Sequence, residues 1–230
     1  MSELSRGNEL KRYKYIIVLD TEFVSSKEGA QPIQISFIAF EIKQDKLMKI
    51  SDFNVYVRLR EGMHLNYFAR KITGITEERL LSNGIYPNMA TQQVISFLLM
   101  FNVDETLIIG WAPQNDKKML NKLMNQDEPL INLDAFDWFD LSKSYKKLNN
   151  ITDNGTPAFK DAMEFYHVKG YHYHDSMEDA RATAFLLGIF LKEHGIEKVI
   201  YEVQRMPVTK KKRTHKHYLP KEEGNKNENH

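Results

Sequence analysis

The sequence predicts an α/β domain built on a mixed sheet, because two arrangements of elements follow each other along the chain. Three predicted strands with short connections come first, at residues 15–19, 32–42 and 55–59. Short connections between consecutive strands favour antiparallel pairing. From about residue 66 onward, predicted helices alternate with two further short apolar segments. We therefore expect a five-stranded sheet, in which three antiparallel strands are followed by strands alternating with helices that flank the sheet.

The first three strands differ in pattern. Residues 15–19 form a continuous apolar run rich in β-branched side chains, which is typical of a strand buried on both faces. This run leads directly into Asp20-Thr21-Glu22. The second and third strands have apolar residues at alternate positions, and Asp45-Lys46 is expected to form the turn between them.

The later elements are predicted from apolar spacing and from helix-capping residues. The last helix is the clearest, because Met177, Ala180, Ala184 and Leu187 recur at steps of three and four. Asp175 is expected to be its N-cap, in a capping box with Glu178. The other expected helices span residues 66–73, 91–101, 116–124, 139–148 and 159–166, and the other expected strands span residues 106–109 and 130–136.

Composition is that of an ordinary globular protein. The 230 residues are 42% hydrophobic and 27% charged, a length and balance that suit one domain with a substantial core. The absence of cysteine excludes disulfides and a thiolate nucleophile, and it fits a reducing cytoplasm. The N-terminus has no apolar signal region, and no apolar run approaches the length of a membrane span. We expect a soluble, cytoplasmic protein with no membrane partner.

Positive charge is concentrated near the C-terminus. Residues 205–221 contain seven lysines or arginines and no acid, although the net charge of the whole chain is only +1. Apolar periodicity ends at about Pro207, so we expect a folded domain over residues 1–206 and a flexible basic tail over residues 207–230. The tail would either contact phosphates or remain a solvated, disordered end.

Asp20 and Glu22 are candidate metal ligands because of their location. Side chains two residues apart on a strand lie on the same face of the sheet. Two carboxylates so placed repel each other unless a cation neutralises them, and oxygen ligands suit Mg²⁺ or Mn²⁺. The alternative is a strand that simply ends in a solvated loop.

Three more candidates lie at the starts of predicted helices. Asp116 and Asp179 each fall in a first helical turn, where the helix dipole favours an acid even without a function. His174 lies just before the predicted N-cap of the last helix, in a loop rich in tyrosine and histidine. Taken singly, each of these residues has an ordinary structural explanation.

In combination, the five residues resemble the pattern of the DEDDh exonucleases, the DnaQ-like group. The pattern is D-x-E, then an aspartate about ninety residues later, then H-x-x-x-x-D at the start of a helix. Two features depart from the commonest form of this pattern. Phe23-Val24-Ser25 replaces Thr-Thr-Gly after D-x-E, and a tryptophan stands five residues before Asp116. The second feature is more similar to the branch containing KapD and the Eri-type RNA exonucleases, and it favours RNA. The segments that carry the resemblance are Val18–Phe23, Gly110–Leu120 and His174–Ala180, with weaker support from Pro32–Ser36 and Ile72–Thr76.

The resemblance implies a ribonuclease H-like fold and a 3′-to-5′ exonuclease that removes nucleoside 5′-monophosphates from single-stranded RNA or DNA. It implies two Mg²⁺ or Mn²⁺ ions, held by Asp20, Glu22, Asp116 and Asp179, with Asp20 bridging both. His174 would be the general base, and it is preferred over His172 because only His174 stands five residues before an aspartate.

Two further expectations concern the substrate and the rival functions. Thr21 and Phe23, beside the acids of the first strand, would contact the substrate; for Phe23 a place in the core is an equal alternative. One rival function is a non-catalytic ribonuclease H-like module that binds nucleic acid or a polymerase, although such a domain would be expected to lose metal ligands. Another is a metal-dependent hydrolase of small phosphate esters.

Overall fold

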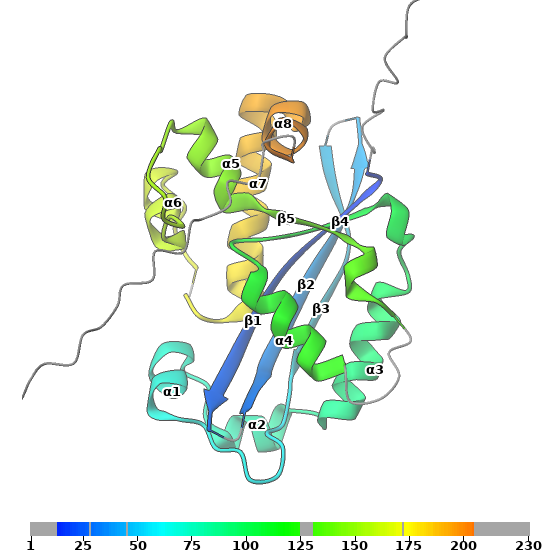
Figure 1. The fold of residues 1–230 in the computed structure, drawn as a ribbon, viewed down its shortest axis with the longest axis vertical. Coiled ribbons are helices and arrows are strands. Elements are labelled where there is room, and N and C mark those ends of the chain that lie inside the picture. Colours follow the sequence, from blue (N-terminus) through cyan, green and yellow to red (C-terminus); the bar gives the residue numbers. More distant parts are fainter. Residues whose placement is uncertain (1–12, 28, 45, 125–130, 172, 205–230) are drawn as a thin grey trace, which may run out of the picture.

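A five-stranded sheet forms the centre of the molecule, with its strands in the order β3-β2-β1-β4-β5 (Figure 1). The structure is a computed structural model and describes residues 13–204 except 28, 45, 125–130 and 172. The predicted tail, Asp45 and His172 therefore lie outside the described residues. The strands are β1 (Tyr15–Ser26), β2 (Gly29–Lys43), β3 (Lys46–Tyr56), β4 (Thr106–Gly110) and β5 (Asp137–Asp140).

The pairing of the strands confirms the predicted mixed sheet. β2 is antiparallel to both β1 and β3, whereas β4 is parallel to β1 and β5 is parallel to β4. β1 therefore lies in the middle, with its antiparallel neighbour on one side and its parallel neighbour on the other.

The first strand is longer than predicted, and this changes the setting of the D-x-E pair. Asp20 and Glu22 do not end β1, because the strand continues to Ser26 and stays paired with β2. The parallel pairing with β4, however, covers only Tyr15–Val18. The two acids thus lie on a continuing strand just beyond its last parallel partner. Ligand sites in such sheets form outside the carboxyl ends of the parallel strands.

Helices cover both faces of the sheet (Figure 1). On one face, Ile16 and Val18 pack with Leu186 and Phe190 of the long helix α7. On the other face, side chains of α3 and α4 cover β1 and β2 in a second apolar cluster. The helices are α1 (Tyr67–Thr73), α2 (Glu77–Asn83), α3 (Pro87–Leu98), α4 (Gln114–Met124), α5 (Leu141–Leu148), α6 (Phe159–Phe165), α7 (Ser176–Ile196) and α8 (Glu202–Gln204).

The prediction of a strand at residues 130–136 is wrong. Leu133–Ala135 is a 3₁₀ turn that the Asn132 side chain caps, and the strand β5 follows it. Phe139, assigned to a helix from the sequence, lies in β5. The four-residue strand Asp-Trp-Phe-Asp has polar ends and is too short to show the alternation of apolar residues that is typical of a strand. The longer apolar run before it therefore gave the stronger indication of a strand, and it was misleading.

Other boundaries also differ from the prediction. The predicted third strand, residues 55–59, overlaps β3 only at its start, and Val57 forms an isolated bridge with Ile85. Helix α2 was not predicted, although its N-cap, Thr76, accepts a hydrogen bond from the Arg79 amide. Helix α3 begins at Pro87, where a proline suits the first helical turn.

The C-terminal part of the described chain continues beyond α7. Gly195 at the end of α7 has a φ of 75°, a π-helical turn follows at Glu197–Tyr201, and α8 comes after it. Tyr201 stacks on Tyr13 near the start of β1, with ring centroids 6.1 Å apart. In the described part of the chain, none of the helices is both long and apolar enough to cross a bilayer.

Gly110 at the end of β4 allows a close approach of three chain segments. A β-carbon at this position would lie 2.8 Å from Cβ of Pro113 and 3.3 Å from the carbonyl oxygen of Leu19. These two atoms belong to the loop before α4 and to the residue before Asp20. The glycine thus holds the start of α4 against β1.

We expect Gly110→Ala to destabilise the protein by about 1–3 kcal/mol, because neither backbone-linked neighbour can move without disturbing the sheet. Gly188→Ala is the matched control, since Gly188 lies within α7 and a β-carbon there meets nothing within 4 Å. The same change should stabilise α7 by about 0.5–1 kcal/mol. Denaturant unfolding of both variants measures the difference, and equal effects would contradict the close approach.

Candidate active site

One cavity of about 720 Å³ brings together all five residues singled out in the sequence. β1 contributes Asp20 and Glu22, and α4 contributes Asp116. His174 and Asp179 come from the loop before α7 and from its first turn. The cavity therefore lies where β1 passes the ends of these two helices.

The two acids of β1 reach the cavity because of the strand's pleat and a bulge. Asp20 and Glu22 continue the row of Ile16 and Val18, which faces α7. The register with β2 shifts between Glu22 and Phe23, so both of these neighbours line the cavity. Bulges of this kind re-aim side chains and are frequent next to active sites.

Asp116 is held in place by Thr21. The backbone N–H of Thr21 donates to Oδ1 of Asp116 at 3.0 Å, and the Thr21 hydroxyl donates to the same oxygen at 2.7 Å. Thr21 lies between the two acids of β1, so this pair of bonds fixes the carboxylate of α4 relative to both. Thr21 lines the cavity, and its hydroxyl group is bonded to Asp116.

Asp140 supports the same region and was not predicted. Its Oδ1 accepts hydrogen bonds from the backbone N–H of Ala112 at 3.0 Å and from the Ser142 hydroxyl at 2.6 Å. Ala112 has a φ of 54°, in the left-handed region, within the loop that leads into α4. Asp140 thus stabilises the unusual loop before Asp116. The sequence contained one signal for this residue, because aspartate is a common N-cap of a helix. The signal was missed because the helix was predicted to begin at residue 139, which lies in β5.

The start of α7 is tied to the sheet by buried polar contacts. Asp175 is the N-cap, as predicted, and it accepts hydrogen bonds from the amides of Met177 and Glu178. The buried Gln34 side chain of β2 donates to Asp175 and accepts from the Ser176 amide. These bonds set the position of the first turn of α7, and therefore of Asp179.

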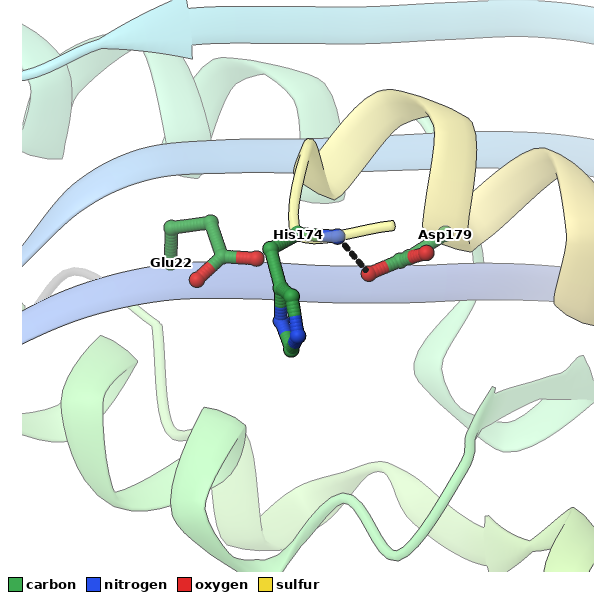
Figure 2. Close-up of side chains that lie close together, drawn as sticks. All are labelled: Glu22, His174 and Asp179. Atoms are coloured by element: carbon green, nitrogen blue, oxygen red, sulfur yellow. Dashed lines mark hydrogen bonds between the residues drawn. The ribbon is translucent and has the colours of Figure 1, made fainter. Parts of the chain in front are cut away.

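Figure 2 shows the carboxylates of Glu22 and Asp179 on either side of His174. One ligand atom from each of these three residues lies within 4.8 Å of the other two, close enough to share a metal ion. His174 has a φ of 66°, and its backbone N–H donates to Oδ2 of Asp179 at 2.9 Å. This contact leaves the imidazole free to face the cavity.

Crowding of the carboxylates perturbs their ionisation. Burial raises the pKa of Glu22 to about 8, and repulsion from Asp179, Asp116 and Asp175 adds to the effect. Burial likewise raises the pKa of Asp179 to about 6, although the hydrogen bond from the His174 amide opposes the shift. Burial also raises the pKa of Asp116 to about 6, against the hydrogen bonds from Thr21.

The pKa values of the remaining two residues, Asp20 and His174, shift in opposite directions. Burial raises the pKa of Asp20 well above its usual range, and repulsion from Asp116 and Glu22 adds to this. Burial lowers the pKa of His174, because the charged imidazolium loses its hydration. The site therefore concentrates negative charge that calls for a cation and keeps its histidine neutral near pH 7.

The residues fit a divalent cation. Oδ1 of Asp179 is buried and, among the described residues, lacks a hydrogen-bond partner, which is costly for a carboxylate oxygen. Three further carboxylates line the same cavity, and carboxylate oxygens are the donors that Mg²⁺ and Mn²⁺ prefer. A cation among Asp20, Glu22, Asp116 and Asp179 would satisfy this oxygen and offset the repulsion.

Four aromatic side chains also line the cavity. Phe23 lies beside Glu22 on β1 and is only partly buried. Trp111, Phe159 and Tyr173 line another part, together with Lys160. Apart from Trp111, which was noted only as a motif departure, these residues were not identified from the sequence, because only the packing of α6 brings residues 159 and 160 beside the acids.

The sequence matches the model of the exonuclease family RNase_T over residues 17–187, which includes all five residues. The chain belongs to this exonuclease family. The assignment agrees with the DEDDh, DnaQ-like pattern and supports a metal-dependent nuclease that hydrolyses phosphodiester bonds. A comparison with curated proteins yields no match.

Solved structures with a similar fold include other nucleases. Cell-death related nuclease 4 (CRN-4) has a TM-score of 0.65 at 16% identity, over 79% of this chain and 65% of that protein. The nuclease domain of 3′hExo, a DEDDh family member bound to rAMP, has a TM-score of 0.64 at 17% identity, over 79% of this chain and 94% of that domain. E. coli ExoI in a complex with single-stranded DNA has a TM-score of 0.64 at 17% identity, over 79% of this chain and 41% of that enzyme. This chain thus spans less than two thirds of the length of CRN-4 and of ExoI.

We expect the metal-free protein to lose stability as the pH rises from about 5 to about 8. The folded-state pKa of Glu22 is about 8 against an ordinary value of 4.5, so the folded state binds more protons than the unfolded state in this range. Added Mg²⁺ or Mn²⁺ should raise the melting temperature more at pH 8 than at pH 5, because protons compete with the cation.

Thermal unfolding across this pH range, with and without metal, measures the effect. Glu22→Gln is the control, since the neutral amide removes one of the titrating groups and should weaken the pH dependence. A melting temperature that depends on pH equally in the wild type and in Glu22→Gln would contradict the raised pKa.

Proposed function

We propose that the protein is a 3′-to-5′ exonuclease that shortens single-stranded nucleic acid and releases nucleoside 5′-monophosphates. The observation that carries this proposal is the shared cavity, which four carboxylates and His174 line together. One oxygen of these carboxylates, Oδ1 of Asp179, is buried without a hydrogen-bond partner among the described residues. The aromatic lining of the same cavity suits unpaired bases, since every base presents a face for stacking.

Two Mg²⁺ or Mn²⁺ ions would be held by Asp20, Glu22, Asp116 and Asp179. When bound, such ions stabilise the negative charge that develops on a phosphate under attack. The chain's own contribution is to place the ligands before the metal arrives. Thr21 fixes Asp116, and the His174 amide fixes Asp179.

His174 would act as the general base. Its lowered pKa keeps the imidazole unprotonated near neutral pH, so it is able to accept a proton from a water molecule. The water oxygen forms the new bond to phosphorus, and the bond between phosphorus and the 3′ oxygen of the preceding nucleotide breaks. That 3′ oxygen leaves with a proton, and the terminal nucleotide departs as a 5′-monophosphate.

The substrate contacts in the proposal come from three places. Phe23 would pack against the terminal nucleotide. Thr21 would contribute indirectly, because its two hydrogen bonds keep Asp116 in position. The basic residues between Arg205 and Lys221 would add contacts to phosphates. RNA is the preferred strand in this proposal, on the strength of the tryptophan-containing middle motif; matched RNA and DNA single strands, degraded with Mg²⁺ and with Mn²⁺, compare the two.

Asp20→Asn should reduce the shortening of a 5′-labelled single strand by more than about 100-fold, because it removes a ligand that the metal needs. The variant should unfold at the same temperature as the wild type or higher, since it also removes a repelling charge. Asp52→Asn, at an exposed position on β3, is the matched control and should retain full activity. Wild-type activity in Asp20→Asn, or cleavage that starts at the 5′ end, would contradict the proposal.

His174→Ala should lower kcat by about 10²–10⁴-fold, which is the usual contribution of a general base. The increase in melting temperature on adding Mn²⁺ should persist, because His174 is not one of the four proposed ligands. His64→Ala, at a highly exposed histidine, should change neither measurement. If His174→Ala abolishes the effect of Mn²⁺, the histidine is a metal ligand instead of the base.

A further inference from the structure

The part of the cavity lining that comes from elements other than β1 includes aromatic as well as acidic side chains. It contains three aromatic side chains, Trp111, Phe159 and Tyr173, which we call the aromatic wall. Lys160 lies next to the wall and, among the described residues that line the cavity, is the only lysine or arginine. The proposed chemistry uses neither the wall nor this lysine.

Trp111 and Phe159 form a preorganised surface. The indole N–H of Trp111 donates to the carbonyl oxygen of Pro157 at 3.0 Å, which joins the loop before α4 to the segment before α6. The rings of Trp111 and Phe159 are 5.2 Å apart and tilted by 55°. Because its N–H is already bonded, Trp111 offers mainly its apolar ring to a ligand. Such a surface is suited to stacking without sequence preference.

Lys160 is able to contact an anion at the edge of this surface. Its ammonium group lies 3.6 Å from the carboxylate of Glu164, one turn later in α6, and both side chains are about two thirds exposed. An exposed pair of this kind contributes little to stability, so it yields readily to a stronger partner. A phosphate outside the acidic cluster would be such a partner.

We propose that Trp111, Phe159 and Lys160 form the subsite for the penultimate nucleotide of the substrate strand, with its base stacked on the aromatic pair and its own 5′ phosphate beside Lys160. The assignment rests on the proposed function, in which the scissile phosphate lies at the carboxylates. That phosphate joins two nucleosides, and Phe23, next to Glu22 on β1, is the lining residue assigned to the terminal one. The aromatic wall is then left for the nucleoside that carries the leaving 3′ oxygen.

Abasic substitution tests the stacking directly. Three single strands are compared: one unmodified, one without the penultimate base and one without the terminal base. In the wild type, loss of the penultimate base should lower kcat/KM for removal of the first nucleotide by roughly 5- to 150-fold, the range of one base stacked on an aromatic ring.

Phe159→Ala should lower kcat/KM on the unmodified strand by a similar factor, and the abasic change at the penultimate position should then have no further effect. Phe159→Tyr keeps a ring, so in this variant the missing penultimate base should again lower kcat/KM. Phe165→Ala, at an exposed phenylalanine of the same helix, is the matched control and should behave as the wild type.

Salt dependence tests the lysine. Lys160→Gln should reduce the slope of log kcat/KM against log salt concentration by about 0.7, the value for one phosphate contact with a single strand. Lys192→Gln, at an exposed position towards the other end of α7, should leave the slope unchanged.

Two results would overturn the subsite while leaving the proposed function intact. One is a wild-type enzyme that shortens the strand without the penultimate base as fast as the unmodified strand. The other is a Phe159→Ala variant that remains sensitive to the missing base. A loss confined to the strand without the terminal base is a form of the first result and overturns the subsite as well, because Phe23 already accounts for the terminal base. A wild-type enzyme that shortens none of the strands refutes the proposed function itself, and the subsite with it.

Discussion

Repulsion among buried carboxylates is the constraint on which the site depends. Asp20, Glu22, Asp116 and Asp179 line one cavity, and the pKa of each is raised by burial, with repulsion between neighbouring acids adding at Asp20 and Glu22. Acids placed in this way lower the stability of the metal-free protein and form a binding site for cations. Oδ1 of Asp179 has no hydrogen-bond partner among the described residues, so hydrogen bonds from this part of the chain do not fully compensate the buried carboxylates.

The surrounding fold holds these groups through bonds from different parts of the chain. Thr21 of β1 fixes Asp116 of α4, and Gln34 of β2 fixes the N-terminus of α7. Asp140 at the end of β5 fixes the loop before α4. Each bond joins residues far apart in sequence. The position of the ligands is thus a property of the sheet's topology.

The cavity combines two chemistries that, in the proposed function, bind the same ligand. The acidic part suits metal ions and the phosphate that they would bind. The aromatic wall and Lys160 suit a base and a phosphate further along the strand. Phe23, beside Glu22, adds an apolar contact next to the acids. A strand with unpaired bases meets all of these features, whereas a small phosphate ester would use only the acidic part.

The sequence by itself determined the mixed sheet and the capped helix α7. It also singled out the residues Asp20, Glu22, Asp116, His174 and Asp179, which the structure places in one cavity. Apolar periodicity, capping chemistry and motif spacing are local, so they are readable along the chain. Only the tertiary structure decided that β1 runs past the acids, that β5 begins at Asp137, and that Asp140, Phe159 and Lys160 belong to the site. Their roles arise from packing between distant segments, and no local pattern records which segments will meet.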